Sequence, residues 1–160
     1  IAMQTCGHAF SSAALVLEWH VLGMYAPGFF TGHLIRRFGV LPVMAVGAVL
    51  NFACVAVALS GVDVMQFLVA LFLLGVGWNC CYVGASALLS DRLSVPERSR
   101  VQGVNDSLLT GTAAGGSLLS GVVFSHLGYT VMGLVCAVVA TVPLILAWRL
   151  ESTRASTGTA

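Results

Sequence analysis

Charged side chains are scarce in this sequence, and lysine is absent from it altogether. Asp, Glu, Lys and Arg make up 8% of the 160 residues, against roughly 25% in an ordinary soluble domain. Apolar residues reach 58%, more than a soluble fold of this size has the interior to bury. The composition therefore excludes a small soluble domain and predicts an integral membrane protein whose main contact partner is the lipid bilayer.

Sequence patterns of catalysis and of several kinds of ligand binding are missing as well. There is no GxSxG, no HExxH and no nucleotide-binding P-loop, so we expect neither an enzyme nor a chain driven directly by ATP. No basic patch with interleaved aromatic residues is present, so we expect no nucleic-acid partner. The five cysteines lack CxxC or Cys/His ligand spacing, so we expect no metal site and no cofactor.

Long apolar stretches, in contrast, are abundant. A membrane-spanning helix needs roughly 20 mainly apolar residues, and about five segments satisfy this, at residues 13–35, 40–60, 64–89, 95–124 and 128–148. We place a break at residues 125–128 because the uncharged run from Ser107 to Trp148 is too long for one crossing. The sequence predicts an all-α transmembrane bundle over residues 1–150 and a disordered cytoplasmic tail over residues 151–160.

The basic residues orient these helices. All seven are arginine, and the path through five helices brings every one of them to the same side of the membrane. Basic residues accumulate on the cytoplasmic side, so we expect the C-terminus of the chain inside and its N-terminus outside. An outside start without a signal peptide suggests that a helix precedes Ile1, so we expect the C-terminal piece of a longer protein. A complete five-helix protein is the alternative.

The loop before the fourth predicted helix contains a capping-box pattern, Ser94-Val95-Pro96-Glu97. In such a box the serine oxygen accepts a backbone N–H and the glutamate bonds back to the cap, so we expect the helix to begin near Val95. At ~1.5 Å per residue, Asp106 then lies ~16 Å along the helix, near the inner edge of the hydrocarbon.

Two segments carry a resemblance to a known family. Residues 32–39, Gly-His-Leu-Ile-Arg-Arg-Phe-Gly, resemble the Gly-x-Leu-x-Asp-Arg-x-Gly-Arg-Arg motif of the major facilitator superfamily, in its degenerate copy between helices eight and nine. Residues 90–103 resemble the loop between helices ten and eleven. The resemblance covers about residues 5–150 and implies the C-terminal half of such a transporter, namely helices eight to twelve and the end of helix seven. The loop residues that it implies as gate residues are Gly32, Arg36, Arg37, Gly39, Asp91, Arg92 and Arg98.

The resemblance implies a secondary active transporter of the bacterial inner (plasma) membrane. Such proteins bind a small molecule near the midplane, between two six-helix halves that rock around it. The partner of this chain would be the missing N-terminal half, and the substrate stays unknown. A proton is the more natural coupling ion because acidic groups near the membrane are few, and the apolar, weakly charged helix faces favour efflux. The alternative is a non-transporting membrane fragment or structural partner that packs through glycine-rich helix faces.

Ionisable and polar groups inside the predicted helices are the candidates for substrate binding or ion coupling, because such groups are costly in lipid. Asp106 either carries a coupling proton or pairs with an inner-loop arginine and locks the inward gate, and its depth favours the second. Glu18 and His20 are either proton-handling groups at the outer side or simply solvated there. Asn79 is a candidate for the cavity, whereas Asn51 is more typical of helix packing. The candidates are Asp106, Asn105, Glu18, His20 and Asn79.

Glycine is frequent within the predicted helices, for example at Gly75 and Gly77 and in the run from Gly111 to Gly121. In lipid, small residues let helix backbones approach closely. The interpretation that these glycines serve close packing is favoured over the one that they allow helices to slide.

Overall fold

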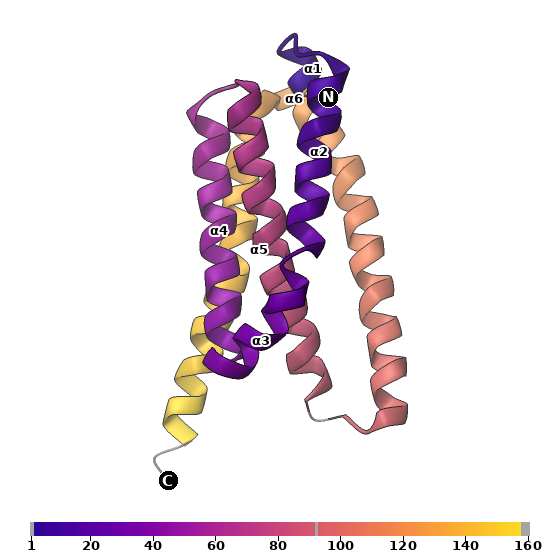
Figure 1. Ribbon diagram of the computed structural model, residues 1–160, viewed down its shortest axis with the longest axis vertical. Helices are drawn as coiled ribbons and strands as arrows, with labels where there is room; N and C mark the ends of the chain where they lie inside the picture. The colour runs from indigo at the N-terminus through magenta and orange to yellow at the C-terminus, as the bar shows by residue number, and fades with distance from the viewer. Residues whose placement is uncertain (1, 92, 158–160) are drawn as a thin grey trace.

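The structure is a computed structural model. It describes the backbone of residues 2–91 and 93–157, with side chains except at residues 129, 140, 143–144, 146–148 and 150–157. In these residues all regular secondary structure is helical, in the order α1 (Ala2–Thr5), α2 (Phe10–Tyr25), α3 (Gly28–Phe38), α4 (Val40–Ser60), α5 (Val64–Ser90) and α6 (Val95–Thr157). The helices form an elongated bundle (Figure 1), which confirms the predicted all-α fold class.

Helices α4 and α5 match the second and third predicted spans almost residue for residue. With 21 and 27 residues, they are ~32 and ~40 Å long, enough to cross a hydrocarbon core of ~30 Å. Residues Val95–Gly128 form a third helix that is long and apolar enough to cross. Three helices of the described chain therefore meet this requirement by themselves.

The first predicted span is not one continuous helix. The structure divides it into α2 and α3 at Ala26 and Pro27. Proline has no N–H to donate to the carbonyl four residues earlier, and its ring collides with that carbonyl, so the helix breaks. Neither α2, with 16 residues, nor α3, with 11, reaches the ~20 residues of a straight span. The expectation of a single helix over residues 13–35 is therefore corrected.

The long helix α6 reverses direction at Gly128, where φ is 77° and ψ is −179°. Such a positive φ suits glycine because it has no Cβ to collide with the backbone. The sequence placed its break at residues 125–128, and the structure places the turn at the last of these. After it the chain returns along α4 (Figure 1). The helix continues to Thr157, so the backbone of residues 151–157 is helical where the sequence predicted a disordered tail.

Close contacts between glycines hold α2, α4 and α5 together. A methyl group added at Gly75 of α5 would lie 2.5 Å from the His20 carbonyl oxygen of α2. One added at Gly47 of α4 would lie 2.8 Å from the Gly77 carbonyl oxygen of α5. Any side chain at these places would force the helices apart, so the structure supports the close-packing interpretation for Gly75 and Gly77.

The glycine-rich part of α6 behaves differently. A methyl group added at Gly111, Gly115, Gly116 or Gly121 would have nothing within 4 Å. The first part of α6 stands beside the bundle in Figure 1, whereas its second part packs on α4, where Gly133 faces Leu59.

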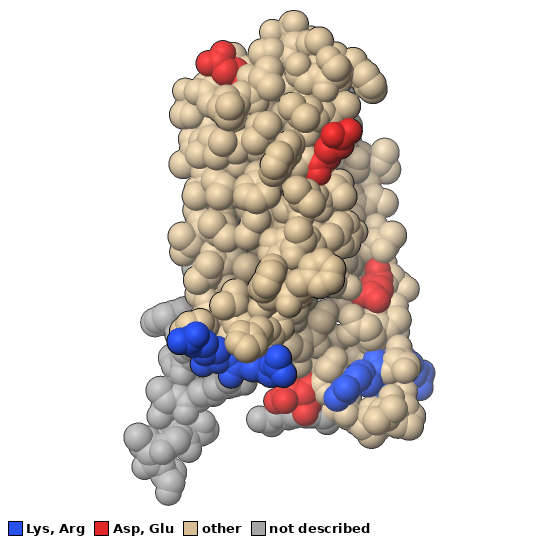
Figure 2. All heavy atoms as spheres, viewed as in Figure 1, with Lys and Arg blue, Asp and Glu red and all other residues tan. Residues whose placement is uncertain are grey.

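Basic side chains gather at one end of the bundle on the face that Figure 2 shows. Arg36 and Arg37 lie in the last turn of α3, where positive charge complements the helix dipole. Arg98 and Arg100 lie in the first turns of α6. We call this the arginine end. The opposite end carries the connection from α4 to α5 at residues 61–63 and the turn at Gly128.

Candidate functional site

A cluster of polar side chains joins α5 to α6 above the arginine end. The Tyr82 hydroxyl of α5 donates to Asp106 Oδ1 at 3.4 Å, and Gln102 Nε2, one turn before Asp106, donates to the same oxygen at 3.3 Å. Asn105 Nδ2 lies 3.5 Å from that oxygen. Gln102 Nε2 also donates to Ser86 Oγ at 3.4 Å. We call these five residues the Asp106 cluster.

The register of the two helices explains how the Asp106 cluster forms. Tyr82 and Ser86 are four residues apart on α5, and Gln102 and Asp106 are four apart on α6, so each pair lies on one helix face. Antiparallel helices then bring Tyr82 opposite Asp106 and Ser86 opposite Gln102. Two candidates from the sequence, Asn105 and Asp106, are thereby brought together. Tyr82, Ser86 and Gln102 were missed, although their four-residue spacing was a usable signal.

The described partners of Asp106 are neutral. We expected Asp106 to pair with an inner-loop arginine, but among the described residues no ion pair of Asp106 is observed. Arg98 Nη2 instead donates to the Ser90 carbonyl oxygen at 3.0 Å and so holds the short connection between α5 and α6. Arg92, another residue of the predicted gate, lies outside the described residues.

Asn79, a candidate for the cavity, is buried between α2, α3 and α5. It is only 4% exposed, and the Thr31 side chain next to it is 1% exposed. Asn79 Nδ2 donates to the Met24 carbonyl oxygen at 2.7 Å, and the Thr31 hydroxyl bonds to Asn79 Oδ1 at 2.6 Å. Asn79 thus ties both sides of the α2–α3 break to α5, supplying a donor to a carbonyl in the last turn of α2.

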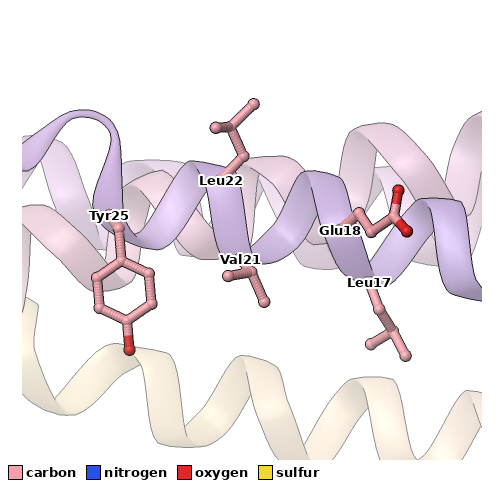
Figure 3. Close-up of a pocket in the computed structure, with 5 residues that line it drawn as sticks. All are labelled: Leu17, Glu18, Val21, Leu22 and Tyr25. Atoms are coloured by element: carbon pink, nitrogen blue, oxygen red, sulfur yellow. The ribbon is translucent and has the colours of Figure 1, made fainter.

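Glu18 and His20 point to different surroundings, as their spacing predicts. His20 Nδ1 lies 2.7 Å from the Leu71 carbonyl oxygen of α5, so His20 takes part in helix packing. Glu18 is exposed and lines an open groove of about 490 Å³ with Leu17, Val21, Leu22 and Tyr25. Leu17, Val21 and Tyr25 point to the same side of α2 (Figure 3).

The motif of residues 32–39 covers the second part of α3 and the turn at Gly39 that leads into α4. Gly39 has a φ of 91°, which favours glycine, and its N–H donates to the Ile35 carbonyl oxygen at 2.8 Å. Arg37 lies with its guanidinium 5.3 Å from the centre of the Phe38 ring. Gly32 has open space around it. Asp91 ends α5 at the same end of the bundle.

The predicted start of α6 at Val95 is observed, but its capping differs in one detail. Glu97 Oε2 accepts the Ser94 N–H at 3.1 Å, as a capping box requires. The Ser94 hydroxyl donates to the same carboxylate instead of accepting a backbone N–H, as the sequence had predicted.

The described cysteines are unpaired thiols. No group of three or more His, Cys, Asp or Glu side chains in the described part of the chain is arranged to hold a metal ion.

Apolar spanning helices, a broken helix packed on a buried asparagine, and a carboxylate held by neutral donors are features of a polytopic membrane protein. Comparison with known proteins gives the family. The sequence matches the Major Facilitator Superfamily over residues 1–160. The chain belongs to the major facilitator superfamily, which confirms the resemblance seen in its loop motifs.

Several curated relatives are similar to most of this chain. It is 45% identical over 149 residues to riboflavin transporter RfnT of Brucella anthropi, which covers 91% of this chain and 37% of that protein. It is 36% identical over 144 residues to the uncharacterized MFS-type transporter YddS of Bacillus subtilis, covering 88% of this chain and 33% of that protein. The multidrug resistance protein MdtL of Shewanella oneidensis is 37% identical over 83 residues, covering 51% of this chain and 21% of that protein.

The chain therefore spans about a third of the length of the first two of these relatives. No solved structure matches it.

Proposed function

We propose that this chain is part of a secondary active transporter that moves a small molecule across the bacterial inner membrane. Riboflavin is the first substrate to test, because a riboflavin transporter is 45% identical over 91% of the chain. The remaining walls of the substrate cavity come from an N-terminal half of the same protein. That half packs against this one, and the two move around the substrate by alternating access.

The proposal assigns proton coupling to Asp106. The observation that carries it is the set of neutral donors around this carboxylate, from Tyr82, Gln102 and Asn105. Among the described residues the partners of Asp106 are neutral, so proton exchange at this carboxylate would not require the breaking of an ion pair with any of them. The same three side chains retain hydrogen-bonding capacity toward a protonated or an ionised carboxyl group, apart from small rotations.

The membrane orientation is part of this proposal. The arginine end faces the cytoplasm, in line with the accumulation of basic residues on that side, and the N-terminus of this chain lies outside. The turn at Gly39 and the connection between α5 and α6 are then cytoplasmic, as expected for gate residues. The proposed direction is efflux, in which protons enter the cell as the substrate leaves it.

The test is counterflow in liposomes. The complete reading frame that contains this chain is expressed, purified and reconstituted into vesicles loaded with unlabelled riboflavin, and the entry of labelled riboflavin is followed. We expect transient accumulation above that in protein-free vesicles. The absence of counterflow with riboflavin and with a panel of multidrug substrates would contradict the transport proposal. The alternative, a membrane protein that only packs with partners through its glycine-rich faces, would then take its place.

A further inference from the structure

Three aromatic side chains from α2 and α5 form a continuous group in the part of the bundle that faces α6. The rings of Trp78 and Tyr82 are stacked, with centroids 4.7 Å apart and an interplanar angle of 7°. Tyr25 of α2 meets Trp78 edge-on, with centroids 6.3 Å apart and an angle of 67°. We call these three residues the aromatic ladder. Trp78 and Tyr82 are partly exposed and Tyr25 is 64% exposed, so the ladder is not sealed inside the bundle.

The aromatic ladder connects two features of the structure. At Tyr25 it joins the open groove on α2, whose lining is apolar except for Glu18. At Tyr82 it reaches the Asp106 cluster through the hydroxyl bond to Asp106 Oδ1. A group of partly exposed aromatic rings therefore leads to a place rich in hydrogen-bonding oxygen atoms. Small-molecule sites combine these two elements, an apolar lining and a few convergent polar groups.

The charged side chains of the groove and of the Asp106 cluster are all acidic. The groove contains the Glu18 carboxylate and no basic side chain among its lining residues. The Asp106 cluster contains a second carboxylate and four neutral residues. Two acids without a nearby described cation attract hydrogen-bond donors and cations and repel anions.

We propose that the aromatic ladder and the groove form the substrate site of this half. The site takes a planar aromatic ring that carries N–H or O–H donors and no negative charge. The ring stacks on an outer face of the Trp78–Tyr82 pair beside Tyr25, and its donors reach the oxygens of the Asp106 cluster. The donors of the bound ring compete with the Tyr82 hydroxyl for Asp106 Oδ1. The inference rests on the proposed transport function and names its substrate class.

Binding is measured on the complete purified protein in detergent, by the quenching of flavin fluorescence that ring stacking on an indole produces. The probes are riboflavin and riboflavin 5′-phosphate, which share one ring system and differ in a negative charge. We expect Trp78→Leu to weaken riboflavin binding by about tenfold or more, in line with the loss of one aromatic stacking partner. We expect the phosphate ester to bind the unaltered protein markedly more weakly than riboflavin.

Trp19 provides a matched control. It is not part of the aromatic ladder and packs edge-on against Phe72, with ring centroids 6.0 Å apart. Trp19→Leu should leave riboflavin affinity within about twofold. Trp78→Phe keeps an aromatic face and should recover most of the affinity lost in Trp78→Leu, which separates stacking from misfolding. Unchanged affinity in Trp78→Leu, failure of Trp78→Phe to recover it, or equal binding of the phosphate ester would overturn the inference.

Failure of the proposed substrate site and failure of the proposed transport function give different results. Counterflow without a Trp78 effect on affinity would leave the transporter and overturn the ladder as its site. Binding that depends on Trp78, without counterflow, would leave the site and overturn the transport proposal. If the unaltered protein binds neither flavin, the planar cation ethidium serves as the second probe. Absence of binding there too would overturn the site.

Discussion

At the scale of single residues, the buried polar groups of this chain have different surroundings and therefore different consequences. Asn79 uses both ends of its amide, with bonds to Met24 and Thr31. Asn51 Oδ1 is buried and has no hydrogen-bond partner. Two asparagines deep in neighbouring apolar helices thus look alike in the sequence and differ in what they stabilise.

Replacing Asn79 by alanine should destabilise the protein by about 1–2 kcal/mol, since each hydrogen bond between helices in a membrane is typically worth ~0.6 kcal/mol and the orphaned Met24 carbonyl adds a cost. Asn51→Ala is the matched control and should cost less, because it removes an amide whose oxygen is already unpaired. The measurement is the apparent melting temperature in one detergent. Equal losses in the two variants would contradict the assigned role of Asn79.

Sequence reasoning found Asp106 and Asn105 as candidates because ionisable and polar groups stand out in an apolar helix. It did not find the neutral partners of Asp106, because tyrosine, serine and glutamine are unremarkable near a membrane boundary. Their role depends on which helices are neighbours, and a single sequence does not state this. Asn79 was favoured for the cavity over a bond between helices, and the structure adds its bonds to Met24 and Thr31.

At the scale of helices, proline and glycine explain where the observed elements depart from simple hydropathy. The long apolar segment that begins near residue 13 contains Pro27, and the structure breaks it there. The uncharged run that follows Ser107 contains Gly128, and the structure turns there. The second break was predicted because the run was too long for one crossing. The first was missed because the segment had the normal length of one crossing, although Pro27 within it is a helix-breaking signal.

Gly75→Ala and Gly103→Ala form a matched pair that tests the helix contacts. Alanine favours a helix over glycine by ~1 kcal/mol at either position. At Gly103 a methyl group meets nothing within 4 Å, so we expect a small gain in stability. At Gly75 the methyl group would lie 2.5 Å from the His20 carbonyl oxygen, and overpacking costs about 1–3 kcal/mol.

We therefore expect a lower melting temperature for Gly75→Ala and an equal or higher one for Gly103→Ala. If both variants gain stability, the close approach of α2 and α5 at Gly75 is absent in the protein.

At the scale of the whole molecule, the distribution of charge is the feature that relates fold to membrane. The composition and the loop motifs were enough to predict a helical membrane bundle of the major facilitator superfamily, and both predictions are confirmed. The orientation in the membrane was predicted from the positions of the arginines. It stays a proposal. The chain covers about a third of the relatives' length, and the proposal assigns the remaining walls of the cavity to the rest of the protein.

Orientation is tested with a membrane-impermeant thiol reagent on intact cells. In a background in which the exposed Cys6 and Cys136 are replaced by alanine, Val62→Cys at the opposite end should react. Ser99→Cys at the arginine end should react only after the membrane is opened. The reverse pattern would place the arginine end outside and contradict the proposed orientation.

The measurement that tests the account most directly compares two kinds of transport by Asp106→Asn in liposomes that contain the complete protein. Exchange of riboflavin at equal pH needs no net proton movement, whereas accumulation driven by a pH gradient does. We predict that Asp106→Asn keeps exchange and loses gradient-driven accumulation, while the control Asp63→Asn, which retains a good helix N-cap, keeps both. Gradient-driven accumulation that survives in Asp106→Asn would contradict the coupling role of this carboxylate.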